Sequence, residues 1–235
     1  VLHWRQSSAR APLPAFLLIR PDSINDHAAR GKKEDDPESQ PGGLAVLLRH
    51  KPLLVVGLAL AIFHLGNAAI MPFYGISAVS DGKANGPGFV ATTIVIAQGV
   101  MVVASIAAMR VAEKRNYWLI LLISFLVLPL RGILAWLLNG WWGVVPVEVL
   151  DGIGTGLQSV AVPGMVTRSL YGTGRVNLAQ GAVITIQGIG AAFSPALGGW
   201  VAHWSGYSTT FHVRGGLGLV DALTWVVLGT AVKQY

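Results

Sequence analysis

Three ionisable residues inside apolar sequence are the strongest candidates for chemistry in this chain. Arg131 lies about nine residues before a short turn at Asn139 and Gly140. Glu148 and Asp151 lie about eight and eleven residues after that turn. Two antiparallel helices joined there would bring all three side chains within roughly one helical turn of the same depth, because a helix rises ~1.5 Å per residue. Glu148 and Asp151 are also three residues apart and share a helix face, so the spacing predicts an ion pair with Arg131.

Further polar residues occur in the same apolar sequence. The uncharged ones are His64, Asn67, Gln98, Gln158 and Gln187. Such side chains either line a polar cavity or form hydrogen bonds between packed helices. Asp221 is another intramembrane charge candidate, and the sequence pattern offers no partner for it.

Six long apolar segments must position these residues. The segments are Leu53–Ser77, Gly88–Met109, Tyr117–Leu138, Trp142–Leu170, Asn177–Ala202 and Thr209–Val232. A run of roughly 20 apolar residues matches the hydrocarbon thickness of a bilayer. Charged residues make up only 12% of the chain, against ~25% in an ordinary globular domain. We therefore predict an all-α membrane protein whose six transmembrane helices occupy residues 51–235.

The basic residues indicate how these helices are oriented. Eight of the 17 lysines and arginines precede the first span, and others follow spans two, four and six. Only Lys83 and Arg214 are assigned to the opposite side. Under the positive-inside rule, this distribution predicts an even number of spans with both termini in the cytoplasm. The net charge of +6 is then explained by topology, and no nucleic-acid partner is predicted.

Residues 1–50 differ in kind from the spans. The stretch from Lys32 to Glu38 has mixed charge and is followed by Pro41, Gly42 and Gly43. Such polar, breaker-rich sequence is typical of a linker. We predict a cytoplasmic N-terminal segment and linker here.

The sequence offers no support for an enzyme. Cysteine is absent, which excludes disulfides and thiolate metal sites. The glycine-rich stretch 151–156 lies inside an apolar span with no preceding strand, so it lacks the context of a phosphate-binding loop. No nucleophile with a positioned base and no zinc-type histidine cluster is evident. We therefore predict no catalytic residue, no metal site and no cofactor.

Two roles for the Arg131 group are open. A structural staple would let a buried arginine and a carboxylate satisfy each other at membrane depth, where an isolated charge is costly. Alternatively, one carboxylate gains and loses a proton during a transport cycle, with Arg131 setting its pKa. The second hypothesis predicts that Asp151→Asn abolishes proton-driven transport but leaves folded protein in the membrane.

Three sequence blocks resemble a known family. The blocks are 128–132 (LPLRG), 150–156 (LDGIGTG) and 172–181 (GTGRVNLAQG). In order and spacing, they resemble the C-terminal half of a bacterial branch of the major facilitator superfamily, and the resemblance covers about residues 15–232. That family has twelve helices in two six-helix halves around a central cavity, with the substrate near the midplane. The resemblance implies that residues 21–50 correspond to the central cytoplasmic loop.

The same resemblance carries over to particular residues. It implies that spans one, two, four and five line the cavity, which favours His64, Asn67, Gln98, Gln158 and Gln187 as cavity residues. Arg131 and Asp151 match motif positions of the family. Residues 110–115 fall at its short charged loop motif, although this copy is degenerate.

The resemblance implies a function. We expect a secondary active transporter of a small solute, working by alternating access in a bacterial inner membrane, with a proton gradient as a candidate driving force. The first six helices of the family are absent from this sequence, so the partner would be a missing N-terminal half or a second copy in a homodimer. The alternative is a truncated, non-transporting membrane module or partner subunit.

Overall fold

The computed structural model describes residues 50–82, 86–113, 116–138 and 140–233. The segment predicted for residues 1–50 therefore lies outside the described residues, except for His50. Lys83 and Asn139 also lie outside them, as do the last two residues of the 110–115 loop motif. The described residues form helices and contain no strand.

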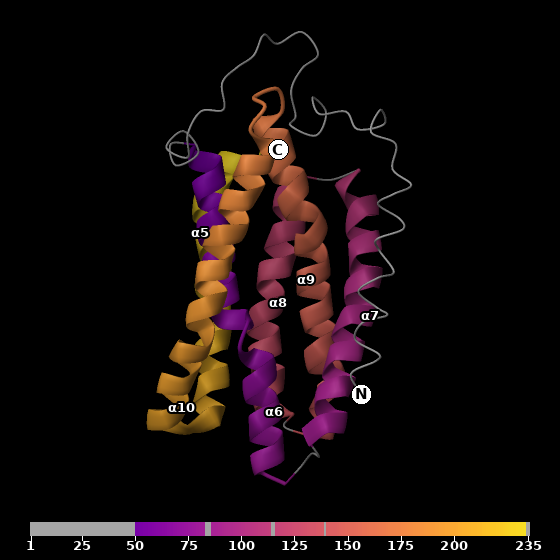
Figure 1. The fold of residues 1–235 in the computed structure, drawn as a ribbon, viewed down its shortest axis with the longest axis vertical. Coiled ribbons are helices and arrows are strands. Elements are labelled where there is room, and N and C mark those ends of the chain that lie inside the picture. The colour runs from indigo at the N-terminus through magenta and orange to yellow at the C-terminus, as the bar shows by residue number, and fades with distance from the viewer. Residues whose placement is uncertain (1–49, 83–85, 114–115, 139, 234–235) are drawn as a thin grey trace, which may run out of the picture.

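Helices run side by side along the length of the molecule, and the short helix α6 follows α5 after a break (Figure 1). They are α5 (Lys51–Asn67), α6 (Ile70–Ser80), α7 (Gly86–Ala112), α8 (Tyr117–Leu137), α9 (Trp141–Leu170) and α10 (Val176–Leu228), followed by the short 3₁₀ helix η2 (Gly229–Val232). The main contacts pair α10 with α5 and α8, and α9 with α7 and α8. The predicted apolar segments all fall on these helices.

Within the described residues, four helical stretches are long and apolar enough to cross a membrane. They are Lys51–Ser80, which joins α5 and α6, and then α7, α8 and α10. The 30-residue helix α9 is less apolar, because it carries several glycines together with Glu148 and Asp151. The all-helical membrane architecture is thus confirmed, and the count of six spans stays a prediction.

Helix α10 is a hairpin of two helical parts. Gly206 has φ +78° and ψ 168°, a left-handed backbone that glycine adopts without a steric penalty. Nη1 of Arg214 lies 2.9 Å from Oγ of Ser194, although a straight helix would place residues 20 apart at a separation of ~30 Å. The chain therefore turns back at Gly206, and two of the predicted apolar segments lie on the two arms (Figure 1).

Small residues let the helices approach closely. A Cβ on Gly190 of α10 would lie 2.1 Å from the carbonyl oxygen of Ala61 on α5. A Cβ on Gly152 of α9 would lie 2.6 Å from the carbonyl oxygen of Ala97 on α7. Real side chains cannot occupy such positions, so the helix pairs depend on glycine there.

A break between α5 and α6 interrupts the first apolar segment. Pro72 cannot donate a backbone hydrogen bond, and its ring disfavours a helical carbonyl four residues earlier, at Ala68. Two of the backbone groups at the break bond to α10 instead. Ala69 N donates to Ser194 Oγ at 3.1 Å, and Gly66 O accepts from Arg214 Nη1 at 2.9 Å. The break is therefore held by partners in the protein, as backbone at membrane depth requires.

Candidate functional site

Arg131 on α8 is the centre of a buried charge cluster. Its guanidinium is 1% exposed and donates from Nε to the carbonyl oxygen of Val147 at 3.2 Å. Nη1 lies 2.7 Å from Oδ1 of Asp151 and donates to Oδ1 of Asn67 at 2.7 Å. Nη2 lies 3.3 Å from Oε1 of Glu148. The ion pair expected from the spacing around Gly140 is therefore present, and it involves both carboxylates.

Asn67 joins the cluster from a third helix. It is the last residue of α5, and its Nδ2 donates to Oδ1 of Asp151 at 3.0 Å. The side chain of Glu148 is fully buried, whereas that of Asp151 is 18% exposed. The charge cluster, defined here as Asn67, Arg131, Glu148 and Asp151, thus connects α5, α8 and α9.

The charges in this cluster do not balance when both carboxylates are ionised. One guanidinium contacts two carboxylates. The second buried guanidinium nearby, that of Arg214, bonds to Gly66 and Ser194 and not to these carboxylates, so one carboxylate charge of the cluster has no cation in contact with it. Unpaired charge is expensive away from water. The group becomes neutral when one carboxylate binds a proton, so its chemistry suits the uptake and release of a single proton.

A polar cavity of about 240 Å³ lies close to the cluster, between α5, α9 and α10. Its polar lining residues are His64, Thr155, Gln158, Ser159, Gln180 and Gln187, and Val162, Pro163, Val166 and Ile184 contribute the apolar part of the wall. Three of the five residues predicted for a cavity are therefore brought together here. The hydroxyl of Thr155 donates to the backbone oxygen of Asp151 at 2.7 Å, so cavity and cluster are about one helical turn apart along α9.

The remaining predicted residues lie elsewhere. Asn67 belongs to the charge cluster, and Gln98 is exposed on α7, outside the lining of the polar cavity. Asp221 is fully buried on the second arm of α10. Neither of its carboxylate oxygens has a hydrogen-bond partner among the described residues.

Arg214 is a buried cation, whereas the charge distribution predicts a topological charge on the non-cytoplasmic side. The residue is only 1% exposed, so it is not an exposed loop charge, and the side on which it lies stays a prediction. Its Nη2 donates to the carbonyl oxygen of Ser194 at 3.0 Å, and its Cζ lies 5.3 Å from the ring centroid of Phe73. One signal could have revealed it: Arg214 precedes Asp221 by seven residues, which puts both on one face of a helix.

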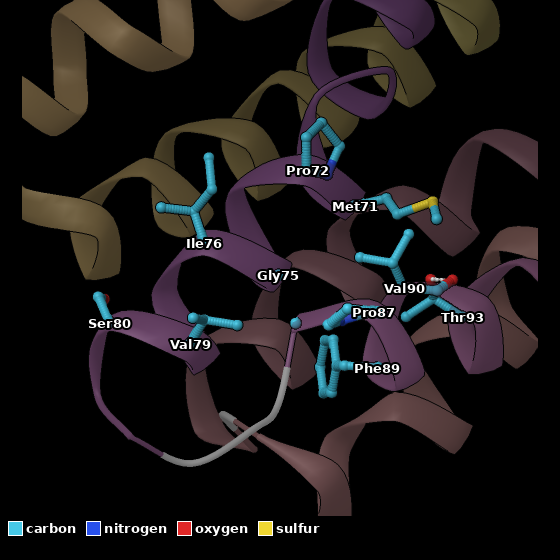
Figure 2. Close-up of a pocket in the computed structure, with 11 residues that line it drawn as sticks. Met71, Pro72, Gly75, Ile76, Val79, Ser80, Pro87, Phe89, Val90 and Thr93 are labelled. Atoms are coloured by element: carbon cyan, nitrogen blue, oxygen red, sulfur yellow. Dashed lines mark hydrogen bonds between the residues drawn. The ribbon is translucent and has the colours of Figure 1, made fainter.

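A larger groove between α6 and α7 contributes no charge to the site. Figure 2 shows its apolar lining, which includes Met71, Ile76 and Val90 around a volume of about 890 Å³. The hydroxyl of Thr93, which also lines it, already donates to Val90 O at 2.7 Å. Its lining residues include the hydroxyls of Ser80 and Thr93 but no titratable, amide or imidazole side chain, so the groove offers no group that could exchange a proton.

The helical bundle, its apolar helices and its buried charges define a multi-pass membrane protein. No family model matches the chain. It is similar to two uncharacterized MFS-type transporters from two strains of Mycobacterium tuberculosis, each 34% identical over 215 residues. The match covers 91% of this chain and 51% of each relative. The chain is thus a homologue of MFS-type transporters that spans about half their length, which confirms the resemblance to this superfamily.

Proposed function

We propose that this chain is a six-span half of a secondary active transporter that moves a small solute by alternating access. The six spans are α5 with α6, then α7, α8, α9 and the two arms of α10. The chain lies in a bacterial inner membrane with both termini in the cytoplasm. The other half is either a missing N-terminal half or a second copy of the chain, because alternating access requires two halves to rock around a shared site.

The observation that carries this proposal is the excess carboxylate in the charge cluster beside a polar cavity. A structural staple needs one carboxylate for one arginine. The second carboxylate adds buried charge at membrane depth, which is costly and is usually associated with function. A proton that binds and leaves during the cycle gives this second carboxylate a role.

The contacts suggest how such a proton affects the helices. Asp151 lies against Arg131 of α8 and Asn67 of α5 through one oxygen, Oδ1. Protonation of this carboxylate removes its charge attraction to Arg131 and weakens the link between α5 and α9. The cavity is built on the same two helices and on α10, so the proton and the solute act on a shared set of contacts.

Proton-coupled solute uptake by proteoliposomes that contain the full chain tests the proposal. Asp151→Asn keeps the size of the side chain and an oxygen for Arg131, but it cannot bind a proton in the same pH range. We expect the variant to lose solute movement driven by a pH gradient and to remain folded. Asp81→Asn, at the exposed end of α6, is the matched control and should keep solute movement driven by a pH gradient. Normal coupling in the Asp151 variant would contradict the proposal.

The competing function is a non-transporting membrane module or partner subunit. The same proteoliposomes separate the two, because a module moves no solute at any pH gradient. A screen should therefore cover neutral, cationic and anionic small solutes. Movement of none of them by this chain, with or without its relatives' N-terminal half, would favour the module.

A further inference from the structure

We propose that the polar cavity binds a small solute rich in hydrogen-bond donors that carries a positively charged nitrogen, such as a primary ammonium. This inference rests on the proposed function in assuming that the cavity holds the solute. The chemistry of the solute follows from the hydrogen-bond donors and acceptors of the lining that have no partner among the described residues.

Gln158 presents its carbonyl oxygen to the cavity. The hydroxyl of Ser124 donates to the carbonyl oxygen of Gly154 at 3.1 Å, which uses its one hydrogen. Ser124 Oγ can therefore only accept from Gln158, whose Nε2 lies 2.8 Å away. This fixes the orientation of the amide and leaves Oε1 of Gln158 without a hydrogen-bond partner among the described residues.

The hydrogen bonds of His64 fix the orientation of the Gln187 amide. His64 Nδ1 lies 3.0 Å from the carbonyl oxygen of Leu60, and a carbonyl can only accept, so Nδ1 carries the hydrogen. In the neutral ring, Nε2 is then an acceptor. Gln187 Nε2 lies 3.0 Å from it and donates. Oε1 of Gln187 is again left for a ligand.

The two hydroxyls of the lining also present lone pairs. Thr155 donates to the backbone oxygen of Asp151 at 2.7 Å, and Ser159 donates to that of Gly156 at 2.8 Å. Each hydroxyl has one hydrogen, so both oxygens can only accept from a solute. The lining thus offers acceptors from Thr155, Gln158, Ser159 and Gln187, against the one remaining N–H of each fixed amide. The amide of Gln180, which no hydrogen bond to the described residues fixes, can either donate or accept.

The nearby charges favour a cation. The cavity lining contains neither lysine nor arginine. About one helical turn away along α9, the charge cluster sets two carboxylates against one guanidinium. An anionic solute would face acceptor oxygens and this negative excess, whereas an ammonium group would donate to the oxygens. The volume of about 240 Å³ equals roughly eight water molecules at ~30 Å³ each, so the solute is small.

A single introduced cysteine can report binding, because the chain has no cysteine of its own. Gln180 lines the cavity and has no hydrogen bond to the described residues that fixes it, so Gln180→Cys places a thiol at the site. The rate of its alkylation by a neutral maleimide is measured in the full chain with n-butylammonium, butyramide or butyrate added. These probes match in size and differ in charge and donors.

Butylammonium should slow alkylation, and at about ten times its Kd the slowing should be roughly tenfold by mass action. Butyramide should have a weaker effect and butyrate none. Ser208→Cys, exposed just after the turn at Gly206, should react at the same rate with every probe. Protection by butyrate equal to that by butylammonium would overturn the inference, as would no protection by butylammonium into the high millimolar range.

Removing an acceptor tests the lining itself. Thr155→Ala in the Gln180→Cys background should weaken protection by butylammonium several-fold. Thr185→Ala is the matched control, since Thr185 donates to a carbonyl four residues earlier in the same way but is exposed outside the cavity. Equal effects of the two variants would contradict the assigned site.

The alkylation experiment and the transport experiment can contradict their two hypotheses independently. Alkylation reports occupancy without any proton gradient. Loss of protection with normal Asp151-dependent transport contradicts only the class of solute. Protection by butylammonium in a chain whose Asp151→Asn variant still couples normally contradicts only the proton-coupled mechanism.

Discussion

Oδ1 of Asp151 lies 3.0 Å from Nδ2 of Asn67 and therefore connects α9 to the last residue of α5. The same oxygen lies 2.7 Å from Nη1 of Arg131, which also donates to Oδ1 of Asn67 at 2.7 Å. The three side chains form a closed ring of polar contacts across α5, α8 and α9. The ring therefore lies where α5 ends, next to the break in the first apolar segment.

Asn67→Ala should destabilise the bundle by about 1–3 kcal/mol, because Asp151 and Arg131 each lose a buried hydrogen-bond partner. The variant should unfold at a lower temperature in a thermal-denaturation assay in detergent. Asn177→Ala, exposed near the start of α10, is the control and should change stability by less than about 0.5 kcal/mol. Equal stability of the two variants would show that the ring contributes little.

Removing Arg131 should be more damaging than removing Asn67. Arg131→Met leaves the buried Glu148 and the partly exposed Asp151 without the cation that contacts them, for an expected loss of about 3–5 kcal/mol. Arg110→Met, at the exposed end of α7, should change stability by no more than about 1 kcal/mol.

Adding Glu148→Gln and Asp151→Asn to Arg131→Met should restore part of the stability, because the unpaired negative charges are then gone. The measurement is thermal unfolding of the single, double and triple variants. Strictly additive losses would mean that Arg131 stabilises the bundle by packing and not by charge.

The sequence predicts the Arg131 pair well because the relevant geometry is local. A short turn and a constant rise per residue suffice to match depths on α8 and α9. The membership of Asn67 is not local, since it depends on how α5 breaks and packs. Arg214 shows the limit of charge counting: the positive-inside rule treats each basic residue as a loop charge, whereas Arg214 bonds to Ser194 and Gly66 inside the bundle.

For the cavity residues, too, the sequence predicts the polar side chains but not the direction in which each helix presents them. Polar character identifies His64, Gln158 and Gln187, but the face on which each lies depends on helix rotation. Gln98 has the same side chain, yet α7 turns it outward. The sequence does not single out Thr155 and Ser159, because hydroxyls that bond to their own helix are common. Their place in the lining of the polar cavity is evident only from the structure.

Gly190→Ala should disrupt the pairing of α10 with α5. The added Cβ would lie 2.1 Å from the carbonyl oxygen of Ala61, and relieving such a clash costs about 1–3 kcal/mol. Gly199→Ala on the same arm is the matched control, because its Cβ would meet nothing within 4 Å. That control should be neutral or gain up to about 1 kcal/mol from higher helix propensity. Thermal unfolding compares the two, and a Gly190 variant as stable as the Gly199 variant would contradict the close approach.

Asp221→Val should stabilise the protein, in contrast to substitutions in the charge cluster. Both carboxylate oxygens of Asp221 are buried without a partner among the described residues, and an unsatisfied buried polar group costs about 1–3 kcal/mol. Valine is apolar and similar in size, so the unfolding temperature should rise. If Asp221 instead gains a partner in another conformation of a transport cycle, the variant should be more stable in detergent yet move solute more slowly. A lower unfolding temperature would mean that the carboxylate is already satisfied in the folded bundle, and the expected gain would then be wrong.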